Sequence, residues 1–145
     1  MSSDLVIALV GLVLLAIGGL AVLGMQSRGG EALGLIDGAL ADCPASPNCV
    51  SSEAGTPDDK KIEPLAISDW ESLPDIIEAM GGVVTAQDDS YLAAEFTSGT
   101  FGFVDDLEAR LTETNVHVRS GSRVGHSDAG VNAARVADLR ERLAE

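Results

Sequence analysis

Residues 101–135 read FGFVDDLEARLTETNVHVRSGSRVGHSDAGVNAAR, and the architecture of the chain can be worked out from them. Two runs in this stretch alternate apolar and polar residues, as a half-buried β-strand does, and residues 112–115 separate them as a tight turn. A glycine-rich loop and the start of a helix follow. The stretch therefore predicts a β-hairpin and a helix that can pack against it.

The turn fixes how the two strands pair, because a shift by one residue would move every side chain to the other face. Pairing Leu111 with Val116 leaves one apolar face, which holds Leu107 and Ala109 opposite Ser120 and Val118. The other face is charged. Its members pair as Glu108 with Arg119, Arg110 with His117 and Asp106 with Arg123. Exposed pairs of this kind contribute about a few tenths of a kcal/mol each, so we interpret these charge pairs as a solvated surface.

Polar residues also fall on the apolar face, where they need partners. The same register places Asp105 opposite Ser122. The following helix, capped by Ser127 or Asp128 and extending to about residue 143, carries Asn132 in the middle of its apolar stripe. A buried amide must be hydrogen-bonded. We therefore predict a buried polar cluster between the sheet and the last helix, made of Asp105, Ser120, Ser122, Asp128, Asn132 and Arg135.

Residues 62–98 predict the rest of the domain. The elements expected there are an edge strand at 62–67 that Pro64 bars from a central place, a helix from Ser72 to Gly81 with Pro74 in its first turn, and a hairpin of residues 82–86 and 91–98. Together with the later hairpin and helix, these elements give an α+β fold. It is a small antiparallel sheet of four or five strands packed by two helices, behind one N-terminal transmembrane helix.

The transmembrane helix is predicted from residues 5–25, LVIALVGLVLLAIGGLAVLGM, which are 21 residues without a charge. As a helix they extend roughly 31 Å, which matches the hydrocarbon core of a bilayer. A cleavable secretory signal is the alternative, but no Lys or Arg precedes the run, the run is long for a signal, and no A-x-A pattern follows it. We predict a single-pass anchor at residues 1–25 in the cell membrane, with the lipid bilayer as its partner.

Gly11, Gly18 and Ala21 lie on one stripe of this helix, where a helix of another membrane protein could approach closely. Glycine is common in membrane helices, so the stripe alone does not require such a partner. Residues 26–42 are rich in glycine and predict a flexible tether, with at most a short interfacial helix at 32–40. The globular domain is then residues 43–145.

Cys43 and Cys49 are the only cysteines. A disulfide across the short loop between them would contribute about 2 kcal/mol and would suit a domain on the exported side of the membrane. Arg28 argues for the opposite orientation, because positive residues tend to stay on the cytoplasmic side. Free thiols, and a metal site that includes His117 and His126, are the alternatives to the disulfide, although the spacing matches no common zinc pattern.

The chain carries a formal net charge of −14. Such a surface repels nucleic acid and anionic headgroups, because their phosphates would add negative charge to negative charge. We therefore expect no nucleic-acid partner.

Four separated segments, CPASPNCVSS, YLAAEF, FGFVDDLE and VRSGSRVGHSDAGVNAARV, together resemble domain-of-unknown-function family 1499 (DUF1499) over about residues 43–143. The resemblance implies a protein that is exported or attached to a membrane, and it implies no established chemistry. The motif positions it carries over are Cys43, Asn48, Cys49, Phe101, Gly102, Asp105, Asp106, Arg119, Ser120, Ser122, Arg123, Gly125, Asp128, Gly130, Asn132 and Arg135. His126 departs from the motif, which has an aromatic residue such as tyrosine there.

We expect a membrane-anchored accessory or interaction domain, a small subunit or partner of a membrane protein complex, with no cofactor and no metal. Buried polar clusters commonly fix one packing arrangement instead of performing chemistry.

The alternative is a ligand-binding or hydrolytic enzyme in which Asp105 is a base, with Asn132 beside it and Arg135 or Arg123 binding an anion. Its support is limited, because GHSDAG at residues 125–130 lacks the strand-elbow spacing of a hydrolase. Asp105 and Asp106 also point to opposite faces of a strand and cannot act together as acid and base. A redox or metal role of the two cysteines is a third possibility.

Overall fold

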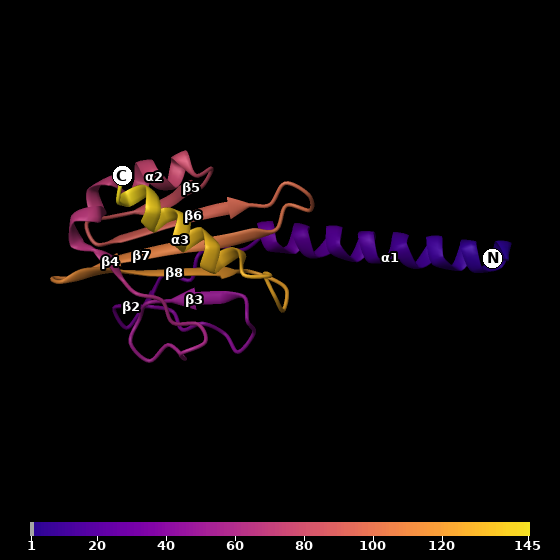
Figure 1. Ribbon diagram of the computed structural model, residues 1–145, viewed down its shortest axis with the longest axis horizontal. Helices are drawn as coiled ribbons and strands as arrows, with labels where there is room; N and C mark the ends of the chain where they lie inside the picture. The colour runs from indigo at the N-terminus through magenta and orange to yellow at the C-terminus, as the bar shows by residue number, and fades with distance from the viewer. Residues whose placement is uncertain (1) are drawn as a thin grey trace.

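The computed structural model describes residues 2–145, and its long first helix projects from an α+β domain (Figure 1). The elements are, in chain order, α1 (Ser3–Arg28), β1 (Leu35–Ile36), β2 (Ala39–Leu40), β3 (Cys49–Ser51), β4 (Leu65–Ala66), the 3₁₀-helix η1 (Ile67–Ser72), α2 (Leu73–Ala79), β5 (Val83–Gln87), β6 (Tyr91–Thr97), β7 (Val104–Leu111), β8 (Asn115–Ser122) and α3 (Val131–Leu143).

Six strands form the main sheet, and the paired strands run antiparallel. Its order is β3-β8-β7-β6-β5, and β4 pairs with the start of β8, further along the edge that β3 occupies. The sequence predicted four or five strands. The strand it missed is β3, which is three residues long and too short to show an alternating pattern.

The central hairpin of β7 and β8 pairs in the predicted register. Leu111 lies opposite Val116, and Asp105 lies opposite Ser122. Because every other pairing follows from these two, the division of the hairpin into an apolar and a charged face is also as predicted.

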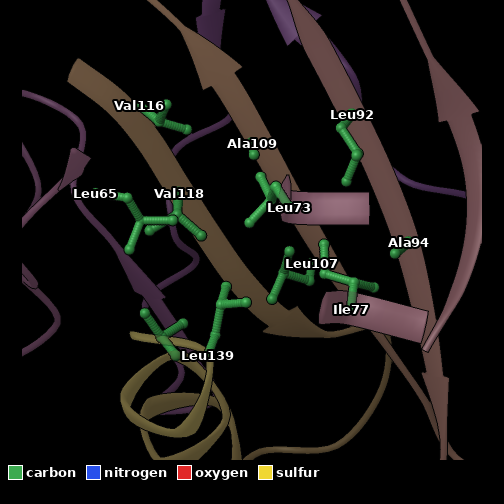
Figure 2. Packing of buried hydrophobic residues seen from close by; sticks show 11 residues of the cluster. Leu65, Leu73, Ile77, Leu92, Ala94, Leu107, Ala109, Val116, Val118 and Leu139 are labelled. Carbon is green, nitrogen blue, oxygen red and sulfur yellow. The ribbon is translucent and has the colours of Figure 1, made fainter. Parts of the chain in front are cut away.

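The apolar face of the sheet packs against α2 and α3, which lie on the same side of it (Figure 1). Figure 2 shows Leu107 of β7 and Val118 of β8 turned toward Ile77 of α2 and Leu139 of α3. All four side chains are fully buried. Burial of this apolar surface is the main stabilising contribution to the domain. The antiparallel sheet and the two helices packed on it confirm the α+β prediction.

The other face of the sheet is covered too, by the segment expected to be a tether. The Gly34 amide donates to Glu108 Oε1 (2.8 Å), and the Leu40 amide donates to Glu53 Oε1 (3.0 Å). Strands β1 and β2 pair with each other within this segment, and Leu40 is 3% exposed. The predictions of a flexible tether and of an interfacial helix at 32–40 are therefore wrong. The glycines of this segment serve turns of the backbone instead, with a φ of 73° at Gly34 and of 80° at Gly38.

Helix α3 begins at Val131, later than the predicted start at Ser127 or Asp128. The two residues before it have left-handed backbones, with a φ of 53° at Ala129 and 83° at Gly130. A right-handed helix cannot extend back through that conformation. The 62–67 strand is likewise shorter than predicted, since β4 begins at Leu65 after the proline.

Helix α1 is long and apolar enough to cross a membrane, with a mean hydropathy of 2.9. A membrane anchor and a signal sequence both have this length and composition. The helix continues three residues past Met25, and the side chains near its end meet the domain, where Gly24 and Ser27 are buried.

Candidate functional site

A polar latch joins β7 and β8 to α3. We use this name for the six residues of the predicted cluster, Asp105, Ser120, Ser122, Asp128, Asn132 and Arg135. Asn132 at its centre is fully buried. Its side-chain oxygen accepts hydrogen bonds from Ser120 Oγ and Arg135 Nη1, both at 2.6 Å. Its Nδ2 donates to Asp128 Oδ2 at 2.8 Å and to Ser122 Oγ at 3.0 Å. The structure thus brings the six predicted residues together.

Arg135 connects the latch to the first residues of β7. Its Nη2 lies 2.7 Å from Asp105 Oδ2, and the two side chains are 10% and 14% exposed. Its guanidinium also lies 4.6 Å from the centre of the Phe96 ring, which adds a cation–π contact. The ion pair therefore holds the first turns of α3 against the sheet.

Asn48 belongs to the same network, although the sequence did not place it there. Its carbonyl oxygen accepts from Asn132 Nδ2 (3.2 Å) and from the Ser122 amide (2.9 Å), and its side chain donates to the Gly125 carbonyl (2.8 Å). Asn48 precedes the disulfide residue Cys49 and is among the positions of the family motif. Its place in the motif was the one indication in the sequence. Every residue has a backbone carbonyl, so a hydrogen bond to that group produces no sequence pattern.

Asp128 caps α3 from outside the helix. Its Oδ1 accepts from the Gly130 amide (3.0 Å), and its Oδ2 accepts from the Asn132 amide (2.8 Å). Partial burial opposes ionisation, but these two backbone bonds and the bond from the Asn132 side chain outweigh it, so the pKa of Asp128 is lowered. The charged carboxylate is the form that holds the helix start.

The latch residues hold three elements together. The Asp105 carboxylate is ion-paired, and the Asn132 amide uses both its oxygen and its nitrogen within the protein. A general base needs a lone pair directed at a substrate, and a nucleophile needs such a base beside it. The bonds described for Asp105 Oδ2 and for the Asn132 amide are made within the protein, where they join the sheet to α3.

The charge pairs predicted on a solvated surface are buried. Glu108 is fully buried, and Asp106 and Arg119 are 4% and 5% exposed. Glu108 Oε1 accepts from the Tyr91 hydroxyl (2.7 Å), and its Oε2 accepts from Arg119 Nη1 (3.2 Å). Burial and the bond to Glu108 raise the pKa of Tyr91. The pairing of Glu108 with Arg119 was predicted correctly and their exposure was not, because residues 33–42 cover this face. Arg110, expected beside His117, forms its ion pair with Glu53 at 2.8 Å.

Arg123 is the centre of a second buried group on the same face. It donates to both Asp106 oxygens, at 2.8 and 2.7 Å, and also to Glu95 and to the Ser27 carbonyl. Its side chain is 7% exposed. The bonds that Arg123 donates to Asp106 and Glu95 raise the pKa of Arg123, although burial acts in the opposite direction. The predicted Asp106–Arg123 pair is thus a bidentate ion pair that reaches the end of α1.

Arg119 is incompletely paired. Among the described residues, its Nε is the one buried side-chain nitrogen or oxygen without a hydrogen-bond partner. Arg119 lines a cavity of about 400 Å³ on the covered face of the sheet. Glu31, Asp42, Asp106 and Arg123 line the same cavity, so its wall carries charges of both signs.

A seam between α1 and the domain was not predicted from the sequence. The Ser27 hydroxyl is fully buried, accepts from the Val104 amide (2.7 Å) and donates to the Val104 carbonyl (3.2 Å). Arg28 donates to the carbonyls of Phe101 (3.0 Å) and Gly102 (3.2 Å). Gly24 lies so close that an added Cβ would stand 2.0 Å from the Phe101 carbonyl oxygen. The end of α1 therefore continues into the domain without a flexible joint.

A second cavity of about 400 Å³ lies beside this seam, on the helix-bearing face of the sheet. Leu20 and Leu23 of α1 form one wall, and the β6–β7 and β8–α3 connections form the others. Most of its lining is apolar, including Phe103, Val124 and Val131, and the latch residues Asp105, Ser122 and Asp128 lie at its polar end.

Cys43 and Cys49 form a disulfide, as predicted, with a Cα–Cα distance of 5.6 Å. The pairing excludes the free-thiol alternative and leaves no thiolate for a metal. His117 Nδ1 lies 3.0 Å from the Ser52 carbonyl oxygen, and His126 is exposed. Within residues 2–145 no three His, Cys, Asp or Glu side chains are grouped to hold a metal ion.

The comparison with protein families gives one match. The profile of DUF1499, described as a protein of unknown function, matches residues 39–143. No curated protein and no solved structure matches the chain significantly. The matched residues include the disulfide, all six strands of the main sheet and the whole polar latch. The chain belongs to the DUF1499 family.

Proposed function

We propose that this chain is a single-pass membrane protein in which α1 is a retained anchor and the domain is a non-enzymatic accessory module, held rigidly at the membrane surface for a membrane protein partner. The observation that carries this proposal is the seam. A signal sequence is removed, so the domain would not be expected to bury its end. Here Ser27 satisfies both backbone groups of Val104, and Gly24 fits against Phe101 with no room for a side chain.

The orientation rests on the disulfide and on the use made of Arg28. A disulfide in a small domain is typical of oxidising compartments, which favours the exported side of the membrane. Arg28 is the residue that argued for the cytosol. Its guanidinium is bonded to the carbonyls of Phe101 and Gly102, so the seam explains its presence without a topological role.

The partner is expected along the small-residue stripe of α1. Gly18 lies nine residues before Ser27, about 2.5 helical turns, so the two face opposite sides of the helix. The domain meets the Ser27 side. Nothing in the described chain lies within 4 Å of a Cβ added at Gly11 or Gly18. A partner helix could therefore pack on that side while the domain stays docked.

The decisive experiment is to isolate the full-length protein from membranes after alkaline extraction and to measure its intact mass. The proposal expects a membrane-bound protein whose mass includes residues 2–28. A soluble protein that begins after residue 28 would overturn it.

Two further measurements test the partner and the orientation. Native electrophoresis in mild detergent should show a complex larger than the monomer. Replacing Gly11 and Gly18 by leucine should reduce that complex to the monomer, whereas replacing Val13 and Ala16 by leucine, on the opposite side of the helix, should not. Thiol alkylation of intact cells should modify no cysteine before reduction and two afterwards. A monomer throughout, or free thiols in the cell, would contradict the corresponding part of the proposal.

A further inference from the structure

The two connections that lie beside α1 carry less charge than the turns at the opposite end of the sheet. In Figure 1 the β6–β7 and β8–α3 connections lie at the end of the domain from which α1 leaves. Residues 97–104 carry no charge, and residues 124–131 carry one acidic residue, Asp128, whose carboxylate is occupied by the start of α3. The turns at the other end of the sheet carry Asp88, Asp89 and Glu113. In a chain of net charge −14, these two connections beside α1 therefore carry little charge.

The cavity beside the seam opens at this end of the domain. Its wall on α1 is made by Leu20 and Leu23, which are 40% and 39% exposed, against 63% and 77% for Leu14 and Leu15. The opposite wall includes Val131, which is 48% exposed at the start of α3. A volume of about 400 Å³ with mostly apolar walls falls in the range of ligand-binding cavities.

The depth of the cavity follows from its position on α1. Leu23 and Leu20 lie two and five residues before Met25, the end of the apolar run, which is about 3 and 8 Å along the helix axis. If α1 spans the membrane, these leucines lie inside the hydrocarbon layer and the cavity opens toward lipid chains. This step rests on the proposed anchor.

We propose that the cavity holds one hydrocarbon chain of a bilayer phospholipid with a zwitterionic headgroup. The chain would lie between the leucines of α1 and the apolar side chains of the two connections, including Phe103 and Val124. An anionic headgroup is disfavoured, because the domain as a whole is acidic. The domain would thereby hold a lipid against its own anchor helix.

The test uses full-length protein in phosphatidylcholine vesicles that contain some phosphatidylcholine with a photoactivatable diazirine in its acyl chain. After illumination, labelled peptides are identified by mass spectrometry. The proposal expects label both on α1 and on residues 97–104 and 124–131. Native mass spectrometry of the detergent-released protein should show one retained phospholipid.

The variant Val131→Asp places a carboxylate in the cavity wall, and an acidic residue in the first turn of a helix does not disfavour the helix. We expect label on the two connections to fall about fivefold and the retained lipid to be lost, because a chain would have to desolvate the charge. Ala133→Asp is the matched control. It adds the same charge two residues along α3 at an exposed position outside this cavity, and it should change neither result.

The labelling results test the lipid site and the membrane anchor separately. Label on α1 with none on the connections would overturn the lipid site and leave the anchor standing. Equal labelling of the connections in Val131→Asp and in the original protein would also overturn it. An unlabelled α1 would overturn the anchor and the lipid site together.

Discussion

At the scale of single residues, the molecule depends on polar side chains that are buried and, apart from Arg119 Nε, hydrogen-bonded among the described residues. Asn132 was found from the helical pattern and Asp105 from the strand register, because both patterns state which side a residue faces. Ser27 and Asn48 were not found as part of any site. Their role comes from contacts with backbone groups distant in sequence, such as the bonds between Ser27 and Val104, and no periodicity records such contacts.

Replacing Asp105 by asparagine tests the latch. The change removes the charge that faces Arg135 in a pair whose side chains are 14% and 10% exposed. Leaving Arg135 unpaired should lower the free energy of unfolding by about 2–4 kcal/mol. Asp138→Asn is the control, because its pair with Arg142 is 47% and 42% exposed and should cost at most about 0.5 kcal/mol. Urea unfolding of both variants makes the comparison, and equal costs would show that the latch is not a structural element.

The capping carboxylate of Asp128 predicts a pH dependence. Its pKa is lowered in the folded state, so the folded protein favours the charged form. Its contribution to stability is present above the unfolded-state pKa of about 4 and is lost as the pH falls through the lower folded-state value. The difference in unfolding free energy between the original protein and Asp128→Asn should therefore be largest near pH 7 and should shrink below about pH 4. A difference that stays constant from pH 7 to pH 3 would exclude the cap as its source.

At the scale of elements, the sequence predicted the β7–β8 register and failed on what covers the sheet. The alternation of apolar and charged residues along β7 and β8 shows that the two faces of the hairpin differ. It does not show that the charged face is exposed to solvent. The cover is built from β1 and β2, each two residues long, and from glycine-containing turns that look like a linker. Predicting residues 26–42 as a tether and predicting Glu108 and Arg119 as exposed therefore have the same cause. The segment that resembles a linker in its sequence is the one that covers these side chains.

Glu108→Ala distinguishes a buried charge network from a solvated one. The side chain is fully buried and accepts bonds from Tyr91, Gly34 and Arg119. Its removal leaves Arg119 buried and without its one partner, which should cost about 3–5 kcal/mol. Glu113→Ala, at an exposed position in the turn after β7, should change stability by less than about 0.5 kcal/mol. Thermal or urea unfolding measures both, and a cost below about 1 kcal/mol for Glu108→Ala would mean that water reaches this face.

At the scale of the whole molecule, α1 and the domain form one unit. The sequence predicted an apolar helix and a domain as separate parts joined by a tether. It gave no sign that Gly24, Ser27 and Arg28 are shaped to meet Phe101, Gly102 and Val104, because that contact joins segments more than 70 residues apart. A helix joined in this way fixes how the domain stands relative to whatever the helix crosses. The proposed partner contact and the proposed lipid site both depend on that fixed placement.

Gly24→Leu separates the helix from the domain without altering the apolar character of α1. A Cβ at Gly24 would meet the Phe101 carbonyl oxygen at 2.0 Å, so the seam cannot form around a leucine. Gly18→Leu is the matched control, since nothing lies within 4 Å of a Cβ there.

Hydrogen exchange at the Val104 amide, measured on full-length protein in lipid vesicles, tests the seam most directly. That amide donates to the buried Ser27 hydroxyl. The account predicts that it is protected in the original protein and in Gly18→Leu, and that it exchanges at least about tenfold faster in Gly24→Leu, as expected when a local contact opens. Equal protection in all three proteins, or rapid exchange already in the original protein, would contradict a domain locked onto the end of α1.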